Sequence, residues 1–269
     1  NMLYNGVKVS EEGFMTILAI DCGGTQVKSA LVSEEFALEK SLPTQSSPQT
    51  LNQTLDVIDY LVTSVKVALT GIAISVPGTV DTDEGVIYHG GLLRFFHGCR
   101  IKDILEAKYH LPVTALNDGK AAALGELAMG HLQGVTNGAA LVLGSGLGGG
   151  LIINGKLFQG SHFQAAELTF LLPVQMEKVN PSQMRGTTLS AVGFITRVNE
   201  VLGNADLKDG REAFKAINAR NEAVYPIFEA YCRNLAITIL NLQSIFDMEI
   251  FVLGGGISAQ PVLIEEVNR

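Results

Sequence analysis

The sequence predicts an α/β fold made of two related halves. Short apolar runs, typical of buried strands, alternate with longer stretches in which apolar residues recur at a helical spacing. Near the N-terminus, and again in the middle of the chain, two apolar runs flank a glycine-rich turn, a pattern typical of a β-hairpin. The repeated hairpin predicts a duplicated architecture in which each half presents one glycine-rich turn.

The first half is expected to begin with a hairpin over residues 16–32, because apolar runs lie on both sides of its glycines. A helix follows over residues 51–61, where leucine and isoleucine recur at a helical spacing. Residues 72–76 are apolar except for Ser75 and are expected to be a buried strand. A helix over residues 101–109 and a strand over residues 112–116 complete this half.

The second half begins with a helix near Asp118, where an acidic residue suits the helix dipole. A hairpin follows over residues 139–153, and a long apolar helix over residues 226–246 has proline in its first turn, where proline is tolerated. A last strand covers residues 250–253, and residues 180–210 are the least patterned. We place the boundary near Leu116, with domains over residues 15–116 and 117–269.

Composition limits the possible partners. The chain of 269 residues is 47% hydrophobic, enough for a sizeable core. A net charge of −8 and a pI of about 5.1 argue against nucleic acid as a partner. We see neither an apolar run of about 18 residues nor a signal peptide, so no membrane association is expected. Cys22, Cys99 and Cys232 are odd in number and far apart, which indicates reduced thiols in a cytoplasmic protein.

The first glycine turn is Asp21-Cys22-Gly23-Gly24-Thr25. Gly23 and Gly24 can adopt positive φ, and successive backbone N–H groups in such a turn bind anions. Thr25 adds a hydroxyl donor, and Asp21 can hold a metal ion through a water. The alternative interpretation is an ordinary tight hairpin whose glycines serve geometry alone.

The second glycine turn lies in residues 144–150 and is followed by the hairpin signal Asn154-Gly155. It also spells G-x-G-x-x-G, a pattern that indicates a dinucleotide site only where a helix begins at the glycines. An apolar run typical of a strand follows instead, so we reject the dinucleotide interpretation. A third turn, Gly254-Gly255-Gly256, follows the last predicted strand.

Together with Asn117-Asp118, these turns resemble the motifs of the ROK family of sugar kinases and related repressors, within the superfamily of actin, hexokinase and Hsp70-like ATPases. The matching segments are residues 20–28, 117–126, 143–155 and 252–258, in the order of that family's first phosphate, catalytic-aspartate, second phosphate and adenosine motifs. The resemblance runs from about residue 17 to the C-terminus. It implies two ribonuclease H-like (actin-like ATPase) domains with a cleft between them.

The resemblance also implies an ATP-dependent kinase that transfers the γ-phosphate to a hydroxyl, expected to be the 6-hydroxyl, of a hexose or hexoside. Asp118 is then the general base, a role that needs a carboxylate within hydrogen-bond reach of that hydroxyl. The expected sugar contacts are Asn117, Asp118, Glu167 and Gly78. Each has a structural alternative: Asp118 as a helix cap, Asn117 and Gly78 as turn residues, and Glu167 as a surface acid.

By the same resemblance, the cofactors are ATP and Mg²⁺. The ion bridges the β- and γ-phosphates and is held by Asp21 through water, because Mg²⁺ commonly binds one or two carboxylates together with substrate phosphates. The residues expected to bind ATP lie in the three glycine turns: Asp21, Gly23, Gly24, Thr25, Gly144, Ser145, Gly146, Gly148, Gly254, Gly255 and Gly256.

The chain departs from the family pattern around Glu167. Ala166 stands where the family has glycine, and Phe170 stands where many members have a histidine that binds a structural zinc. Residues 177–188 contain no Cys or His for such a site, so no zinc is expected. Members without the zinc motif include kinases of β-glucosides, and residues 94–98 resemble theirs, with His97 either near the sugar or structural.

A sugar-binding regulator without kinase activity is the alternative function. The family's repressors carry an N-terminal helix-turn-helix, and the 20 residues that precede Asp21 are too few for one, so DNA binding is not expected. A kinase-like protein that has lost its activity is a third possibility, against which the retained Asp118 and both phosphate turns count. The resemblance further implies a homodimer.

Overall fold

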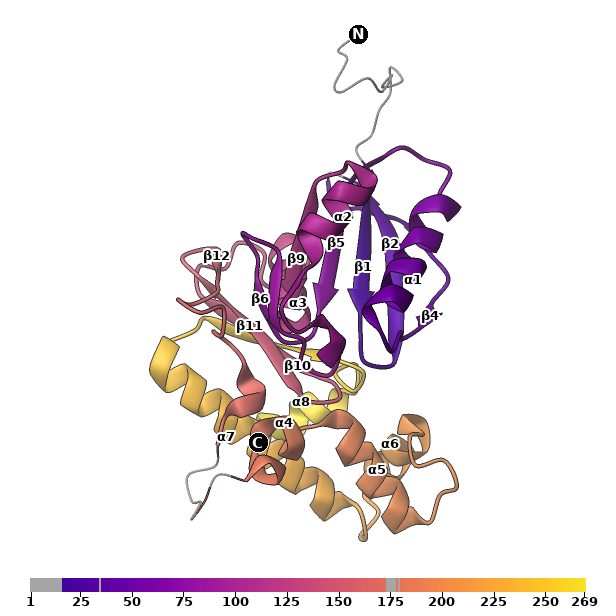
Figure 1. Cartoon of the computed structure of the whole chain (residues 1–269). Helices are drawn as coiled ribbons and strands as arrows, with labels where there is room; N and C mark the ends of the chain where they lie inside the picture. The colour runs from indigo at the N-terminus through magenta and orange to yellow at the C-terminus, as the bar shows by residue number, and fades with distance from the viewer. Residues whose placement is uncertain (1–15, 34, 173–177, 179) are drawn as a thin grey trace. The chain divides into compact units, whose positions relative to one another are not determined.

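The computed structural model describes residues 16–33, 35–172, 178 and 180–269 (Figure 1). The chain divides into two compact units, Asn1–Asp118 and Gly119–Arg269. Each unit has its own principal sheet and its own large hydrophobic core. This mixed α/β organisation agrees with the fold class predicted from the sequence.

The first unit is built on a sheet in the order β3-β2-β1-β5-β9, with β4 also paired to β2. Burial alternates strictly along β1, because successive side chains point to opposite faces of a strand. The strands of this sheet are β1 (Thr16–Cys22), β2 (Gln26–Ser33), β3 (Leu38–Ser41), β4 (Gln45–Ser46), β5 (Leu69–Val76) and β9 (Val113–Asn117).

Two helices and a small sheet complete the first unit. Helix α1 (Leu51–Ser64) is capped by Thr50, whose side chain accepts a hydrogen bond from the Gln53 amide, and it buries Ile58 and Leu61 in the core. The other elements are α2 (Ile101–Tyr109), the strands β6 (Thr79–Asp81), β7 (Val86–His89) and β8 (Cys99–Arg100), and the 3₁₀ turn η1 (Arg94–Phe96).

The second unit has a four-stranded sheet in the order β12-β11-β10-β13. Its strands are β10 (Gly138–Leu143), β11 (Leu147–Ile153), β12 (Lys156–Phe158) and β13 (Ile250–Gly255). Its helices are α3 (Asp118–Met129), α4 (Arg185–Thr188), α5 (Ala191–Leu202), α6 (Gly210–Asn218), α7 (Tyr225–Phe246) and α8 (Pro261–Val267), with 3₁₀ turns η2 (Leu168–Phe170) and η3 (Pro181–Gln183).

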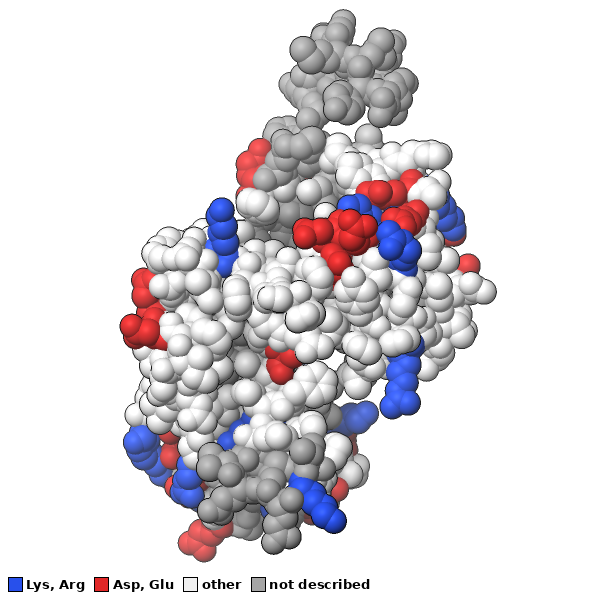
Figure 2. All heavy atoms as spheres, turned by 60° about the vertical axis from the view of Figure 1, so that its left-hand side comes forward, with Lys and Arg blue, Asp and Glu red and all other residues white. Residues whose placement is uncertain are grey.

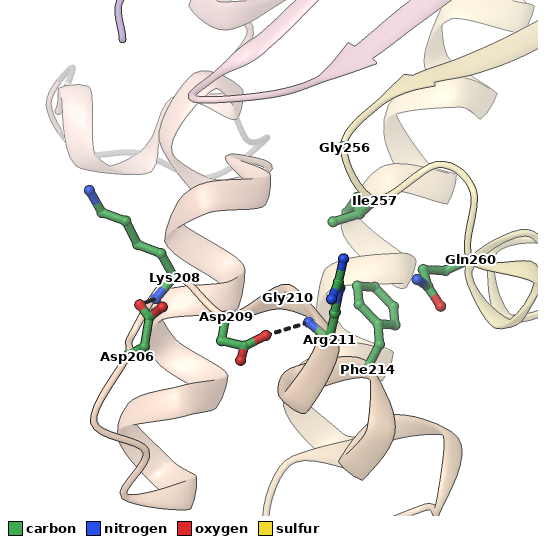
Figure 3. A pocket seen from close by; sticks show the side chains of 9 residues that line it. All are labelled: Asp206, Lys208, Asp209, Gly210, Arg211, Phe214, Gly256, Ile257 and Gln260. Atoms are coloured by element: carbon green, nitrogen blue, oxygen red, sulfur yellow. Dashed lines mark hydrogen bonds between the residues drawn. The ribbon is translucent and has the colours of Figure 1, made fainter. Parts of the chain in front are cut away.

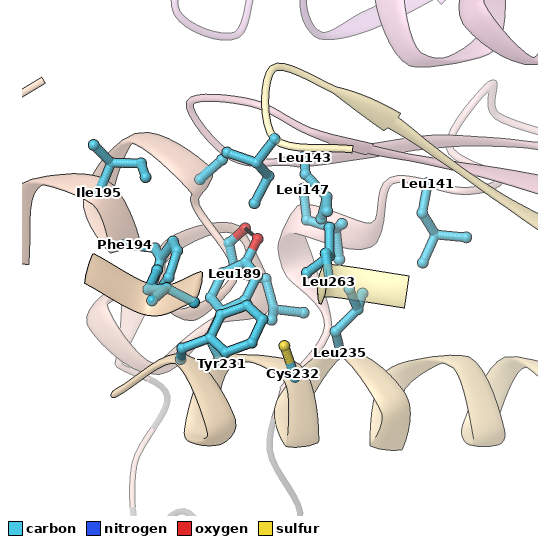
Figure 4. Packing of buried hydrophobic residues seen from close by; sticks show 14 of the residues in the cluster. Leu141, Leu143, Leu147, Leu189, Phe194, Ile195, Tyr231, Cys232, Leu235 and Leu263 are labelled. Carbon is cyan, nitrogen blue, oxygen red and sulfur yellow. Dashed lines mark hydrogen bonds between the residues drawn. The ribbon is translucent and has the colours of Figure 1, made fainter. Parts of the chain in front are cut away.

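Both faces of the second sheet are covered. Leu141 and Leu143 of β10 belong to the large core with α5, α6 and α7, whereas Ala140 belongs to a smaller cluster with Ala123 of α3. Neighbouring residues of one strand therefore face opposite layers. In the large core, Phe194 stacks on Tyr231 with 4.6 Å between ring centroids. Figure 4 shows the two side chains within this cluster.

The two principal sheets repeat one arrangement. Strand β1 pairs antiparallel with β2 and parallel with β5, and β10 pairs antiparallel with β11 and parallel with β13. In each unit the hairpin turn therefore lies at the same sheet edge as the carboxyl end of a parallel neighbour. The duplicated architecture predicted from the sequence is confirmed.

The least patterned part of the sequence contains regular structure as well. Helix α5 lies within residues 180–210 and buries Phe194, Ile195 and Val198. Its start is capped by Ser190 and its end by Gly203 in the left-handed conformation. Both signals are visible in the sequence, but the flanking segments without periodicity conceal them.

The basic side chains of one face of the molecule can be followed in a space-filling view. On the face shown in Figure 2, Lys and Arg side chains are scattered among uncharged residues and do not gather into a patch. Among the helices that the structure describes, none combines the length and the apolar character that crossing a membrane requires.

The buried thiols make stability depend on alkaline pH. Burial raises the pKa of Cys22 from 9.0 to about 12, so the folded thiol stays protonated while the unfolded one ionises. The unfolded state then binds fewer protons, and the free energy of unfolding falls as pH rises from about 9, by ~1.4 kcal/mol per pH unit. Urea unfolding between pH 8 and 10.5 should show the advantage of the wild type over Cys22→Ala shrinking above pH 9. A constant difference between the two proteins would contradict this expectation.

Candidate functional site

Asp21 is held in place by the neighbouring strand. It lies near the carboxyl end of β1, directly beside Ser75 of the parallel strand β5. The Ser75 hydroxyl donates to Oδ1 of Asp21 at 2.7 Å. The carboxylate therefore has one oxygen fixed at the sheet edge.

The turn after Asp21 is closed by its own backbone. The Gly23 amide donates to the Gln26 carbonyl at 3.0 Å, so this N–H serves the turn, although the sequence suggested that it would face a ligand. Ser47 fixes the turn from outside, because its hydroxyl donates to the Gly23 carbonyl and its amide to the Thr25 carbonyl. The amides of the exposed residues Gly24 and Thr25 are the ones positioned to meet an anion.

Asn117 and Gly78 lie together in the first unit. Asn117 is the last residue of β9, and its Nδ2 donates to the Gly78 carbonyl at 2.9 Å. Gly78 has φ of +96°, and a Cβ there would lie 1.9 Å from the His89 carbonyl oxygen. Glycine is thus required by this loop, and the amide nitrogen of Asn117 is used to hold it. A side-chain amide such as that of Asn117 can both donate and accept hydrogen bonds, which is the chemistry that sugar hydroxyls require.

Asp118 follows Asn117 immediately and begins α3. Because β1, β5 and β9 are parallel, their carboxyl ends share one edge of the sheet. The register pairs Asp21 with Ser75 and Val76 with Asn117. The first unit therefore brings the polar ends of all three strands to the edge where open α/β sheets bind their ligands.

His97 and its neighbour His89 belong to the small sheet region of the first unit. Their rings lie 5.0 Å apart between centroids. His89 is also the residue whose carbonyl approaches Gly78. The histidine pair thus packs beside the Gly78 loop, which keeps open both interpretations of His97.

The second glycine turn is anchored to α5. The Gly144 amide donates to the Gly146 carbonyl at 3.1 Å, and the Gly144 carbonyl accepts from the Ala191 amide at 2.9 Å. Ser145 between them is exposed, and Thr169 donates its hydroxyl to the Leu147 carbonyl on the far side of the turn. The turn tip is therefore open to a ligand, while its base is fixed on both sides.

Several glycines of this motif serve packing. A Cβ on Gly149 would lie 2.9 Å from the Ala140 carbonyl oxygen, and one on Gly150 would lie 2.5 Å from the Ala123 Cβ. From the other side, a Cβ on Gly119 would lie 2.5 Å from the Gly149 amide nitrogen. The first turn of α3 therefore lies directly on β11, and a Cβ on Gly148 would also meet Gly119, at an ordinary contact distance of 3.7 Å.

The third glycine turn lies beside the second. In the parallel pair β10–β13, Leu143 is opposite Gly255. Gly255 has φ of +98°, and a Cβ there would lie 2.2 Å from the Leu143 carbonyl oxygen. This position requires glycine, and the close approach brings Gly254 and Gly256 to the same end of the sheet as Gly144.

A pocket of about 400 Å³ lies next to this third turn (Figure 3). Asp209, one of the residues that line it, caps α6 by accepting hydrogen bonds from the amides of Arg211 and Glu212. The pocket contains two basic side chains, Lys208 and Arg211. Sequence analysis did not single them out, because they lie far along the chain from every motif. The lining residues are Asp206, Lys208, Asp209, Gly210, Arg211, Phe214, Gly256, Ile257 and Gln260.

Glu167 precedes η2, in the loop that follows β12. Its charge acts on Lys120, a residue that sequence reasoning quoted only as part of a motif. Lys120 is fully buried, and burial lowers the pKa of its ammonium while the Glu167 charge raises it. A lysine in the first turn of α3 gives no sequence signal of its burial.

The prediction that no zinc is bound concerned residues 177–188, and residues 177 and 179 of this segment lie outside the described residues. Within the described part of the chain, no group of three or more His, Cys, Asp or Glu side chains is arranged to hold a metal ion. Phe170, which stands at the family's histidine position, is exposed. The absence of zinc stays a prediction.

The chain matches the model of the ROK family over residues 17–269. It is 30% identical to a beta-glucoside kinase of Listeria monocytogenes over 95% of this chain and 87% of the relative. Among solved structures, a ROK family protein of Streptococcus pneumoniae in complex with sucrose has a TM-score of 0.80 and 33% identity, over 94% of this chain and 85% of that one. A ROK family glucokinase of Streptomyces griseus in complex with glucose and AMPPNP has a TM-score of 0.80 and 25% identity, over 94% of this chain and 87% of that one.

The contact between α3 and β11 can be tested by adding one methyl group. Gly150→Ala should lower the free energy of unfolding by about 1–3 kcal/mol, because its Cβ overlaps Ala123. Gly125→Ala, in α3 with open space around it, should instead raise that free energy by up to ~1 kcal/mol. Urea denaturation of both variants measures the difference, and equal effects would show that the approach is not tight.

Proposed function

The chain belongs to the ROK family, and we propose that it is an ATP-dependent carbohydrate kinase that transfers the γ-phosphate of ATP to a hydroxyl of a hexose or hexoside. One observation carries the proposal. The carboxyl ends of β1, β5 and β9 bring Asp21, the phosphate-type turn that follows it, and Asn117-Asp118 to a single sheet edge. Phosphoryl transfer needs a held metal–phosphate group and a base for the acceptor hydroxyl, and both kinds of residue lie along this edge.

Asp118 acts as the general base. Its carboxylate accepts the proton of the sugar hydroxyl as that oxygen attacks the γ-phosphate, most simply the 6-hydroxyl, the least hindered of a hexose. The position at the first turn of α3 fixes its backbone, and Gly119 directly behind it is packed against β11. A base held in this way needs little reorganisation to reach the reacting hydroxyl.

The proposed sugar contacts are Asn117 and Gly78 in the first unit and Glu167 in the second. Asn117 contacts one hydroxyl, and the Gly78 loop, held by Asn117 Nδ2, lets backbone approach the ring closely. The Glu167 carboxylate accepts from further hydroxyls. Hexosides are the favoured substrate class, because a beta-glucoside kinase is among the similar relatives and the chain lacks the histidine of the zinc-containing members.

Each unit offers glycine turns of its own to ATP. Gly24 and Thr25 offer amides of the first turn, and Ser145 lies at the exposed tip of the second. The pocket beside Gly256 receives the adenosine, since it adjoins the end of β13 and has mixed polar and apolar walls.

Asp21 is the residue that would hold the Mg²⁺ ion accompanying ATP, through water. The donor set fits this ion, because a carboxylate oxygen is a preferred ligand for Mg²⁺ and the Ser75 hydroxyl keeps the Asp21 carboxylate in a fixed orientation. A bound ion would supply positive charge to offset that of the phosphates. Ser75 is thus the residue that orients the group facing the hydrated ion.

Coupled measurement of ADP production tests the function. With ATP, Mg²⁺ and a panel of hexoses, N-acetylhexosamines and β-glucosides, we expect turnover on one sugar class. Asp118→Asn should lower kcat by about 10²–10⁴-fold while sugar affinity stays within a few-fold, because only the proton acceptor is removed.

The control for this experiment is Asp56→Asn, a change at an exposed aspartate of α1, which should leave turnover unchanged. Sugar binding without any turnover in the wild type would contradict the kinase and favour the sugar-binding regulator. Full activity of Asp118→Asn would remove Asp118 from the role of base.

The metal site gives a separate prediction. Asp21→Asn should raise the Mg²⁺ concentration needed for half-maximal turnover by about 10–100-fold, since the group that orients the hydrated ion loses its charge. Ser75→Ala should shift it in the same direction by less, because the carboxylate remains but loses its hydroxyl donor. A Mg²⁺ titration at fixed ATP measures both, and an unchanged requirement in Asp21→Asn would place the ion elsewhere.

A further inference from the structure

Lys120 is a charged side chain in an unusual place. It is 0% exposed and is among the largest fully buried side chains of the chain. Lysine is almost never fully buried unless it is paired, because the desolvated ammonium must be compensated by nearby polar groups. Its partners should therefore indicate what the buried charge does.

One partner is the loop between β12 and η2. The Lys120 Nζ donates to the carbonyl oxygen of Phe163 at 2.5 Å. Phe163 and Ala166 both adopt the left-handed backbone conformation, with φ of 57° and 61°. Such values are unfavourable for residues with a Cβ and persist only where the surroundings impose them. The ammonium meets the loop at one of these two residues.

The second partner is Glu167, which ends this loop. Its negative charge acts on the Lys120 ammonium and opposes the lowering of the lysine pKa by burial. The Glu167 amide donates to the Gln164 carbonyl, and the Leu168 amide donates to the Ala166 carbonyl. Glu167 is thus fixed at the end of a tight turn while its charge faces a buried cation.

The backbone of Lys120 is packed tightly against strand β11. A Cβ on Gly150 would lie 3.1 Å from the Lys120 Cα, and Gly119 before it is packed against Gly149. The backbone of the lysine is therefore fixed to β11, and its side chain extends to the Glu167 loop. A single residue thus links the start of α3, the glycine-rich strand and the acid.

We infer that Lys120 is a positioning residue: its buried ammonium holds the loop of residues 159–167 and thereby orients the Glu167 carboxylate toward the sugar. The inference rests on the proposed sugar-binding role of Glu167. Without the ammonium, the loop loses the donor at Phe163 and the acid loses its counter-charge. The sugar should then bind more weakly, while ATP binding should be unaffected.

Kinetics of Lys120→Met, which keeps an unbranched chain without the charge, test the inference. We expect the KM for the sugar to rise by about tenfold or more, as for loss of a hydrogen bond to a charged group, and the KM for ATP to change by less than about twofold. Lys120→Arg restores a cation and a donor and should recover most of the sugar affinity. Lys156→Met, at an exposed lysine of β12, is the matched control and should change neither KM.

A double-mutant cycle shows whether Lys120 acts through Glu167. If it does, adding Lys120→Met to Glu167→Gln should change the sugar KM by less than about twofold, because the acid no longer benefits from its orientation. Effects that simply multiply would overturn the inference. So would a Lys120→Met protein whose melting temperature falls while its sugar KM stays unchanged.

Amide hydrogen exchange provides a readout that needs no turnover. Exchange of residues 159–167 should become faster in Lys120→Met and stay unchanged in Lys156→Met, since only the first loses the donor to Phe163. Unchanged exchange in Lys120→Met would overturn the inference even if the kinase is active. Absence of turnover by the wild type on every sugar would instead contradict the proposed function, with the exchange result still deciding whether Lys120 holds the loop. If Lys120→Met does not fold, Lys120→Gln, whose amide ends short of the Phe163 carbonyl, replaces it in every arm.

Discussion

The first turn of α3 lies against the glycine-rich strand β11 with no side chain between the two backbones, and much of the site depends on this approach. A Cβ on Gly119 would lie 2.5 Å from the Gly149 amide nitrogen, and one on Gly150 would lie 2.5 Å from the Ala123 Cβ. Asp118 begins the same turn, so the backbone of the proposed base is fixed by a contact that only glycine permits. The strand that supports this contact also forms one side of the second glycine turn.

Glycine therefore has two different uses in one motif. Residues 144–146 form a turn whose tip is exposed, whereas Gly149 and Gly150 are buried and make room for a helix. Gly255 permits a close approach between two strands, because its positive φ and its approach to the Leu143 carbonyl bring the third turn beside the second. Catalysis by positioning needs rigid backbone under its ligand contacts, and these close approaches provide it.

Much of this organisation could be predicted from the sequence, because glycine turns between apolar runs and the Asn117-Asp118 pair are local patterns. The paired hairpins and the α/β class follow from them. What the sequence could not indicate depends on contacts between distant segments: Lys120 beside the loop after β12, Asn117 holding Gly78, and the Gly23 amide used within its own turn. Helix α5 was missed because the segments on either side of it lack apolar periodicity. The homodimer stays a prediction.

The central claim is that Asp118 receives the proton of the acceptor hydroxyl. A crystal structure with Mg²⁺, a non-hydrolysable ATP analogue and the sugar identified by turnover tests it most directly, through the distance from the Asp118 carboxylate to each hydroxyl. The account predicts one hydroxyl within about 2.6–3.2 Å of that carboxylate and facing the γ-phosphate. Two observations together would contradict the claim. The sugar hydroxyl nearest the γ-phosphate would contact a different acid, and Asp118 would be hydrogen-bonded only to amides of its own helix.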